Sequence, residues 1–232
     1  MSASLLLKLS LFLGISLTGL PCAAQEKQIT NVRFVTFPVL TGGEAVELIV
    51  GDGKTTAIEL PTNSLSKPYQ IENIRKCTLG KTVTDDEGKA SFTVYGQTAA
   101  LTSKEQIILV IRKGAKLSDG LELTAFDSSQ KGFGGGKYFL MNASNVDIAG
   151  KIGSSTFKLT PNKHTLLAPK PSKVENNRKY LYTEIHFRKG DLQRPFYTST
   201  WRFSENARCM VFFHHDENSK QLRTHTIRHY TE

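Results

Sequence analysis

The chain contains little cysteine and a single tryptophan among its 232 residues. Its cysteines are Cys22, Cys77 and Cys209, and Cys22 lies in a leader-like segment. Without that segment, at most one disulfide bond can form, between Cys77 and Cys209. Both lie in apolar segments, and a bridge requires their Cα atoms to come within about 7 Å. The sequence therefore leaves open whether they form a bridge or remain two buried free thiols. No histidine motif of a cysteine hydrolase accompanies either residue.

The sequence also lacks the motifs of common hydrolases and nucleotide-binding proteins. It has no Gly-x-Ser-x-Gly nucleophile motif. The glycine-rich stretches 132–136 and 150–153 have neither the spacing of a phosphate-binding loop nor a predicted helix after them. The carboxylates Asp85, Asp86 and Glu87 share one turn, where we expect them to face solvent. The sequence indicates no cofactor and favours a non-enzymatic protein over an enzyme.

Residues 1–24 have the pattern of a secretory signal peptide. Lys8 supplies a positive charge, an apolar run follows it, and small residues precede a cleavage site after Ala24. The run is too short for a comfortable membrane span. We therefore expect the mature chain to be periplasmic or secreted, without a transmembrane segment. The alternative is a lipoprotein acylated on Cys22, although Pro21 directly before it fits that motif poorly. Export to an oxidising compartment permits a disulfide bond.

The mature chain shows the period-two alternation of β-strands rather than the 3.6-residue period of helices. In residues 132–167, short alternating runs are separated by Gly, Pro and Asn, which is the signal of consecutive hairpins. Segments 44–50 and 55–60 flank Gly51-Asp52-Gly53-Lys54, so we expect a hairpin there. The almost continuously apolar segment 106–113 predicts a central strand covered on both faces. No long amphipathic helix and no internal repeat is evident.

About fourteen short strands separated by turns indicate an all-β chain of the antiparallel β-sandwich type. The Gly-, Ser- and Lys-rich segment 127–136 is the clearest internal break. We therefore predict a signal peptide at 1–24, an N-terminal β domain at 25–130 and a C-terminal β domain at 131–232. One large antiparallel sandwich is the alternative.

The run YFLMNAS, followed by IAGKIGSSTFKLTPNKHTLL, resembles segments of uncharacterised exported all-β proteins of bacteria. In such chains a strand that ends in Asn-x-Ser is followed by a hairpin and a Leu-x-Pro-Gly turn. Here the turn is Leu159-Thr160-Pro161-Asn162, and asparagine is the next-best residue after glycine for a left-handed conformation. The resemblance covers part of the chain and implies a fold type but no activity.

Positive charge is the main chemical feature of the chain. The net charge is +9, and loss of Lys8 with the leader reduces it to +8. Such a charge allows binding to anionic polysaccharide, lipid headgroups or nucleic acid, although many exported proteins are simply basic. The residues Trp201, Tyr197, Arg202 and Arg188 form a candidate binding surface, because aromatic residues and arginine are enriched where proteins bind. The competing interpretation places the aromatic residues in the core of a sandwich.

All six histidines lie after residue 160. Neutral imidazole is the commonest transition-metal ligand, so a site that combines His214, His215, His225 and His229 is conceivable. On a regular strand His225 and His229 share one face. No HxH or HExxH spacing is present, and exposed histidines on a basic hairpin are the simpler interpretation. The sequence therefore predicts no metal site.

These features together predict an exported, non-enzymatic β-sandwich protein that serves as a binding or structural module of the cell envelope. Its expected partner is an envelope protein or an anionic polymer. The alternative is a metal-handling protein, or a polyanion- or carbohydrate-binding protein, that uses the His- and Arg-rich C-terminal half.

Overall fold

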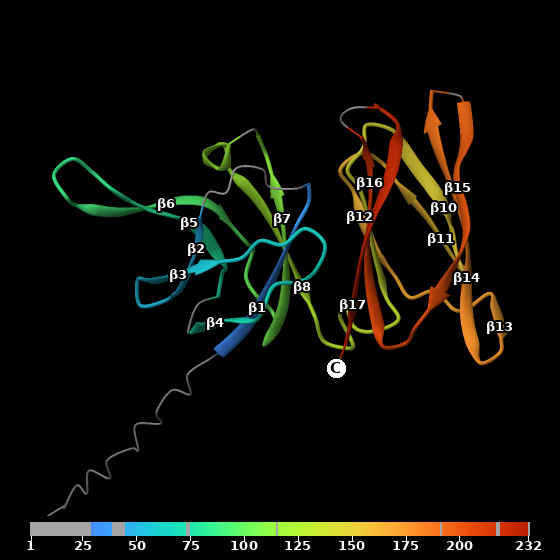
Figure 1. The fold of residues 1–232 in the computed structure, drawn as a ribbon, viewed down its shortest axis with the longest axis horizontal. Helices are drawn as coiled ribbons and strands as arrows, with labels where there is room; N and C mark the ends of the chain where they lie inside the picture. The colour runs from blue at the N-terminus through green and yellow to red at the C-terminus, as the bar shows by residue number, and fades with distance from the viewer. Residues whose placement is uncertain are drawn as a thin grey trace, which may run out of the picture.

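The computed structural model describes residues 29–38, 45–72, 75–114, 116–190, 192–216 and 219–231. These residues form seventeen strands and one short 3-10 turn, η1, so the all-β prediction is confirmed. The strands build four sheets, with β1–β8 in one half of the molecule and β9–β17 in the other (Figure 1). The predicted signal peptide and Cys22 lie outside the described residues. Within the described ranges, no helix has the length and apolarity needed to cross a membrane.

The N-terminal half consists of two four-stranded sheets. Sheet A has the order β4-β1-β7-β8 and sheet B the order β3-β2-β5-β6. Their bounds are Ile29–Thr36 (β1), Val46–Gly51 (β2), Lys54–Ile58 (β3), Tyr69–Glu72 (β4), Thr78–Thr84 (β5), Ala90–Gln97 (β6), Glu105–Arg112 (β7), Leu117–Asp119 (η1) and Leu121–Asp127 (β8). The predicted β2–β3 hairpin is present. Its turn residues Asp52 and Gly53 have φ values of 47° and 72°, and the tight two-residue turn of type I′ requires positive φ at both positions.

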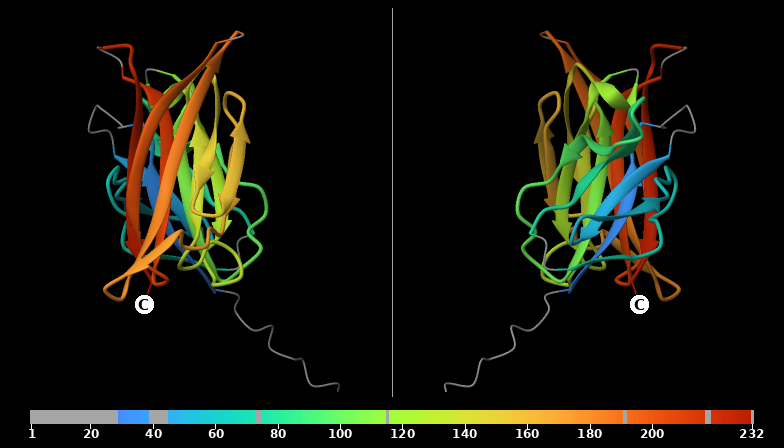
Figure 2. Two further views of the ribbon diagram at one scale, coloured as in Figure 1. Left: turned by 90° about the vertical axis from the view of Figure 1, so that its right-hand side faces the viewer. Right: turned by 90° about the vertical axis from the view of Figure 1, so that its left-hand side faces the viewer.

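The C-terminal half also consists of two sheets. Sheet C has the order β12-β9-β16-β17, and sheet D has β11-β10-β14, with β15 pairing the other edge of β14. The short strand β13 pairs with the start of β14. Their bounds are Tyr138–Asn142 (β9), Asp147–Ile152 (β10), Ser155–Leu159 (β11), His164–Leu167 (β12), Lys173–Glu175 (β13), Arg178–Lys189 (β14), Leu192–Phe203 (β15), Ala207–His215 (β16) and Leu222–Tyr230 (β17). Figure 2 shows the long β14–β15 hairpin on the outer side of this half.

The two halves repeat one topology. Strands β1–β8 correspond in order to β9–β12 and β14–β17, and β13 is an additional strand. In each half the first strand pairs in parallel with the seventh, β1 with β7 and β9 with β16, and the other strand pairs are antiparallel. Leu79 and Ile185 each flank a register shift in the pairing with the next strand, so their partners Leu48 and Gly150 occupy equivalent positions. Equivalent positions thus carry different residues, and the repeat is not evident in the sequence.

Each half has its own apolar core. The core between sheets A and B contains Leu48 and Leu79, and the core between sheets C and D contains Leu181 and Ile185. All four side chains are fully buried. Alternate residues of paired strands supply these side chains, as expected where one face of a sheet is covered by another sheet.

A third core joins the two halves through sheets A and C. Phe37 stacks on Phe212 across this core, with ring centroids 4.4 Å apart. Strand β7 contributes Ile107 to the third core and Ile108 to the core between sheets A and B. The sequence-based prediction of a central strand covered on both faces is therefore confirmed for β7. Sheets A and C are inner layers, and sheets B and D are outer layers.

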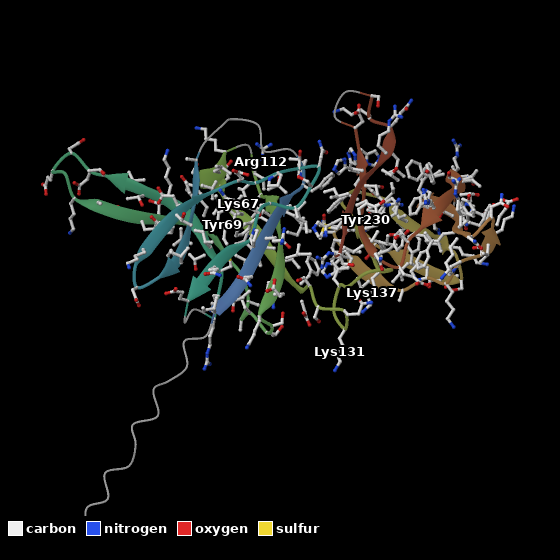
Figure 3. The ribbon with its side chains drawn as sticks, turned by 60° about the horizontal axis from the view of Figure 1, so that its bottom comes forward. Lys67, Tyr69, Arg112, Lys131, Lys137 and Tyr230 are labelled. Atoms are coloured by element: carbon white, nitrogen blue, oxygen red, sulfur yellow. The ribbon has the colours of Figure 1, made fainter. Side chains whose placement is uncertain are left out.

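Residues 128–137, which connect β8 to β9, are held by two basic side chains. The ammonium group of Lys137 donates to the carbonyl oxygens of Gln130, Lys131 and Gly132 at 2.6–2.9 Å. Lys131 and Lys137 lie together at this connection (Figure 3). Arg208 on β16 is buried and donates to the carbonyl of Phe133 at 3.0 Å. The segment predicted as an internal break is thus a tightly bonded connection.

Candidate binding groove

A groove of about 1300 Å³ opens at one end of the C-terminal half. It is surrounded by three connections, between β9 and β10, β11 and β12, and β16 and β17, and by residues of the strands β14 and β15. We refer to this space as the groove. Its lining combines an aromatic wall, a polar floor and a basic rim.

The aromatic wall comes from the β14–β15 hairpin. Ile185 pairs with Tyr197 and His186 pairs with Pro195, so Phe196 is an extra residue in a β-bulge. A bulge redirects a side chain that would otherwise alternate to the opposite face. Phe196 and Tyr197 are adjacent in sequence, yet both pack against the core between sheets C and D and both line the groove. Their ring centroids are 6.4 Å apart.

A second aromatic residue fixes the position of Tyr197. The indole Nε1 of Trp201 donates to the Tyr197 hydroxyl at 3.0 Å. The Trp201 ring stacks on buried Tyr138, with centroids 6.0 Å apart and an interplanar angle of 15°. Tyr197 therefore presents its ring to the groove from a position that is anchored in the core.

The polar floor depends on Asn142, which is fully buried at the end of β9. Its amide nitrogen donates to the carbonyl oxygens of Val146 and Leu159 at 2.7 and 3.0 Å. Its amide oxygen accepts hydrogen bonds from the backbone and hydroxyl of Ser144 at 3.0 and 2.6 Å. Asn142 and Ser144 are the Asn-x-Ser pair of the sequence motif. Their role is structural, because they tie the β9–β10 connection to the end of β11.

The turn after β11 confirms one detail of the sequence analysis. Asn162 has φ of 62°, the left-handed conformation that asparagine adopts more readily than other non-glycine residues. Its backbone N–H donates to the carbonyl of Asn142 at 2.8 Å. Asn162 thereby closes the polar side of the groove.

The basic rim consists of His215, Lys220 and Arg223, from the end of β16 and the start of β17. No aspartate or glutamate is among the described residues that line the groove. Asp216 lies next to the rim, where its carboxylate accepts the backbone N–H of Ser219 at 2.7 Å. Cationic groups on one side and aromatic rings on the other suit a ligand with both negative charge and apolar surface.

The structure separates the four residues of the predicted binding surface. Trp201 and Tyr197 pair with buried residues of β14 and point between the sheets. Arg202 and Arg188 are exposed on the opposite face of sheet D. Successive residues of a strand point to opposite faces, so Trp201 and Arg202 cannot share one surface. Of the four, only Tyr197 lines the groove.

The four candidate metal-binding histidines do not converge. His214 and His225 lie beside Phe37 in the core between sheets A and C, with ring centroids 5.3 and 5.8 Å from it. His229 is on the same face of β17 as His225, as predicted, and its Nδ1 lies 3.3 Å from Nε of Arg208. His215 points to the other face and lines the groove. In the part of the chain that the structure describes, no three His, Cys, Asp or Glu side chains are grouped as metal ligands.

Cys77 and Cys209 are both buried free thiols. Cys77 belongs to the core between sheets A and B, and Cys209 to the core between sheets C and D. The sequence left open a disulfide bond or two buried free thiols, and the structure has the two free thiols. Burial raises the pKa of the Cys77 thiol, so this group is a poor nucleophile at neutral pH.

The four-residue binding surface predicted from the sequence did not include Phe196, Lys220 or Arg223, which line the groove. Lys220 lies in the connection between β16 and β17, and Arg223 lies at the start of β17, so their proximity could have been inferred from a hairpin. Phe196 could not, because its orientation depends on a bulge. Comparison with protein-family models and with curated protein sequences found no match for this chain.

Proposed function

We propose that the protein is an exported, non-enzymatic binding module of the cell envelope, and that the groove holds an anionic partner. The observation that carries this proposal is the composition of the groove. Three basic side chains and no described carboxylate line it, opposite the rings of Phe196 and Tyr197. The +8 charge expected for the mature chain favours the approach of an anionic partner from a distance.

The aromatic wall is anchored in the core, and this rigidity supports a role in ligand binding. Tyr197 is held by its hydrogen bond from Trp201, so little side-chain entropy is lost when a ligand packs on its ring. Rigid aromatic groups beside cationic groups are typical of interfaces that recognise anionic or sugar ligands. The groove offers these binding groups without a nucleophile and base in hydrogen-bond contact among the described lining residues.

The proposal is tested with polygalacturonate, a linear acidic polysaccharide, and with neutral dextran as the reference polymer. We expect the mature chain to bind polygalacturonate, more weakly as salt increases, and to bind dextran poorly. The double variant K220Q/R223Q removes two rim charges and is expected to lose most of this binding. The matched control K54Q/K104Q removes two exposed charges from the N-terminal half and is expected to retain it. Equal binding by the two variants contradicts the proposal.

A further inference from the structure

The hairpin of β5 and β6 forms an arm that projects from the N-terminal half, on the side away from the C-terminal half (Figure 1). Strand β2 pairs with β5 only at Leu79 and Gly80. From Lys81 onward, β5 pairs only with β6, so the outer part of the arm is a two-stranded ribbon. Val83 and Val94 on the arm are 44% and 55% exposed. A ribbon with this exposed apolar surface buries little of it within its own chain.

The tip of the arm is acidic. Asp85, Asp86 and Glu87 follow one another in the turn, and all three are exposed. The Asp85 carboxylate accepts the backbone N–H groups of Glu87 and Lys89 at 3.2 and 2.7 Å. Asp85 therefore shapes the turn. Asp86 and Glu87 are the carboxylates available to a partner.

The base of the arm is held in place by Glu47 on β2. Its carboxylate accepts hydrogen bonds from the backbone N–H and the hydroxyl of Thr82 at 3.1 and 2.5 Å. This bond restrains the outer ribbon relative to sheet B. The acidic tip is thus presented on a defined projection rather than on a free loop.

The tip and the groove are complementary in charge and in apolar surface. The tip offers carboxylates beside exposed Val83, and the groove offers Lys220 and Arg223 opposite aromatic rings. Within one chain they cannot meet, because the arm projects away from the half that contains the groove (Figure 1). Between two chains nothing in this arrangement prevents the contact.

We propose that the β5–β6 tip of one copy occupies the groove of a second copy. This inference rests on the proposed function of the groove as an anion-binding site, and it names the anionic partner as another molecule of the same protein. Asp86 and Glu87 then face Lys220 and Arg223, and Val83 approaches the aromatic wall. Because tip and groove are different surfaces, a joined pair of copies still has one free groove, on the first copy, and one free tip, on the second. Such a heterologous contact builds a head-to-tail chain unless the rotation closes a ring.

The test uses the mature full-length protein and two neutralising variants, D86N/E87Q for the tip and K220Q/R223Q for the groove. Asp85 is left intact because it shapes the turn. Light scattering after size-exclusion chromatography measures molar mass over a concentration series at low and high salt. The wild-type protein is expected to form assemblies larger than one chain that shorten as concentration falls or salt rises. Each variant alone is expected to remain a monomer with a wild-type circular dichroism spectrum.

Mixing the two variants gives the sharpest result. The mixture contains one intact groove, on the tip variant, and one intact tip, on the groove variant. We therefore expect a 1:1 complex that grows no further, while the control K54Q/K104Q assembles like the wild type. A wild-type protein that is monomeric at all concentrations overturns the inference, as does assembly that persists in either variant alone. If that monomer still binds polygalacturonate through Lys220 and Arg223, the proposed function stands and only self-assembly is refuted.

Discussion

Replacement of Asn142 by alanine tests whether the floor of the groove depends on one buried amide. The variant removes four hydrogen bonds, two donated to the carbonyls of Val146 and Leu159 and two accepted from Ser144. At about 1 kcal/mol net for each buried hydrogen bond, the expected loss in the free energy of unfolding is about 4 kcal/mol. The matched variant Ser144→Ala removes only the hydroxyl, which donates to the Asn142 amide oxygen at 2.6 Å and accepts the Val146 N–H at 3.4 Å, and its expected loss is about 2 kcal/mol.

Equilibrium urea unfolding of residues 25–232 measures both losses. With a denaturant dependence of about 2 kcal/mol per molar urea, Asn142→Ala lowers the midpoint by about 2 M and Ser144→Ala by about 1 M. Under conditions where circular dichroism shows the Asn142→Ala variant to be folded, it is also expected to bind polygalacturonate more weakly, because the β9–β10 connection is no longer tied to β11. A midpoint shift no larger than that of Ser144→Ala refutes the argument. The Asn142 amide would then contribute no more to the free energy of unfolding than the Ser144 hydroxyl does.

Two further predictions concern the core between the halves and the arm. Phe212→Ala removes the ring that stacks on Phe37 and is expected to cost about 3–5 kcal/mol in urea unfolding; a loss below about 1 kcal/mol contradicts a well-packed contact between sheets A and C. The hydrogen bond from the Thr82 hydroxyl holds the pKa of Glu47 below its ordinary value. Its contribution to arm stability is therefore present above the ordinary glutamate pKa and is lost as pH falls through the lowered one. Thr82→Val is expected to raise the pKa of Glu47 in an NMR titration of its carboxylate, and an unchanged titration midpoint counts against the bond.

The sequence was sufficient for features that depend on local chemistry. The β2–β3 turn was predictable because Asp52 and Gly53 tolerate positive φ, and β7 because its apolar run leaves no polar face. The left-handed Asn162 was predictable for the same local reason. Pairing between distant strands was not predictable from the sequence. The parallel pairs β1–β7 and β9–β16 join segments far apart in the chain, and alternation within a strand does not specify its neighbours.

The four residues of the predicted binding surface do not share one face, and the sequence itself contained the reason. Trp201 and Arg202 are adjacent, so any regular strand directs them to opposite faces. Tyr197 lines the groove, but its neighbour there is Phe196, which only the bulge brings to the same side. The rim residues Lys220 and Arg223 come from another sheet, and their approach to Tyr197 follows from how sheets C and D pack.

The two halves differ at the position that is equivalent to Tyr197 of the aromatic wall. Both have a bulge at the equivalent place, with Tyr95 as the extra residue in β6 and Phe196 in β15. The next residue is Gly96 in the first half and Tyr197 in the second. At Gly96 the edge strands meet so closely that a Cβ atom would lie 2.5 Å from the Leu121 carbonyl oxygen of β8.

In the second half Tyr197 occupies the equivalent position and lines the groove. Further along, Arg228 of β17 donates to the Arg202 carbonyl of β15 at 3.0 Å, so the same two edge strands approach each other there. One topology thus has a glycine after the bulge where β6 and β8 meet closely and a tyrosine where the groove opens. The basic side chains of the rim then add the charge that we expect to attract an anionic partner.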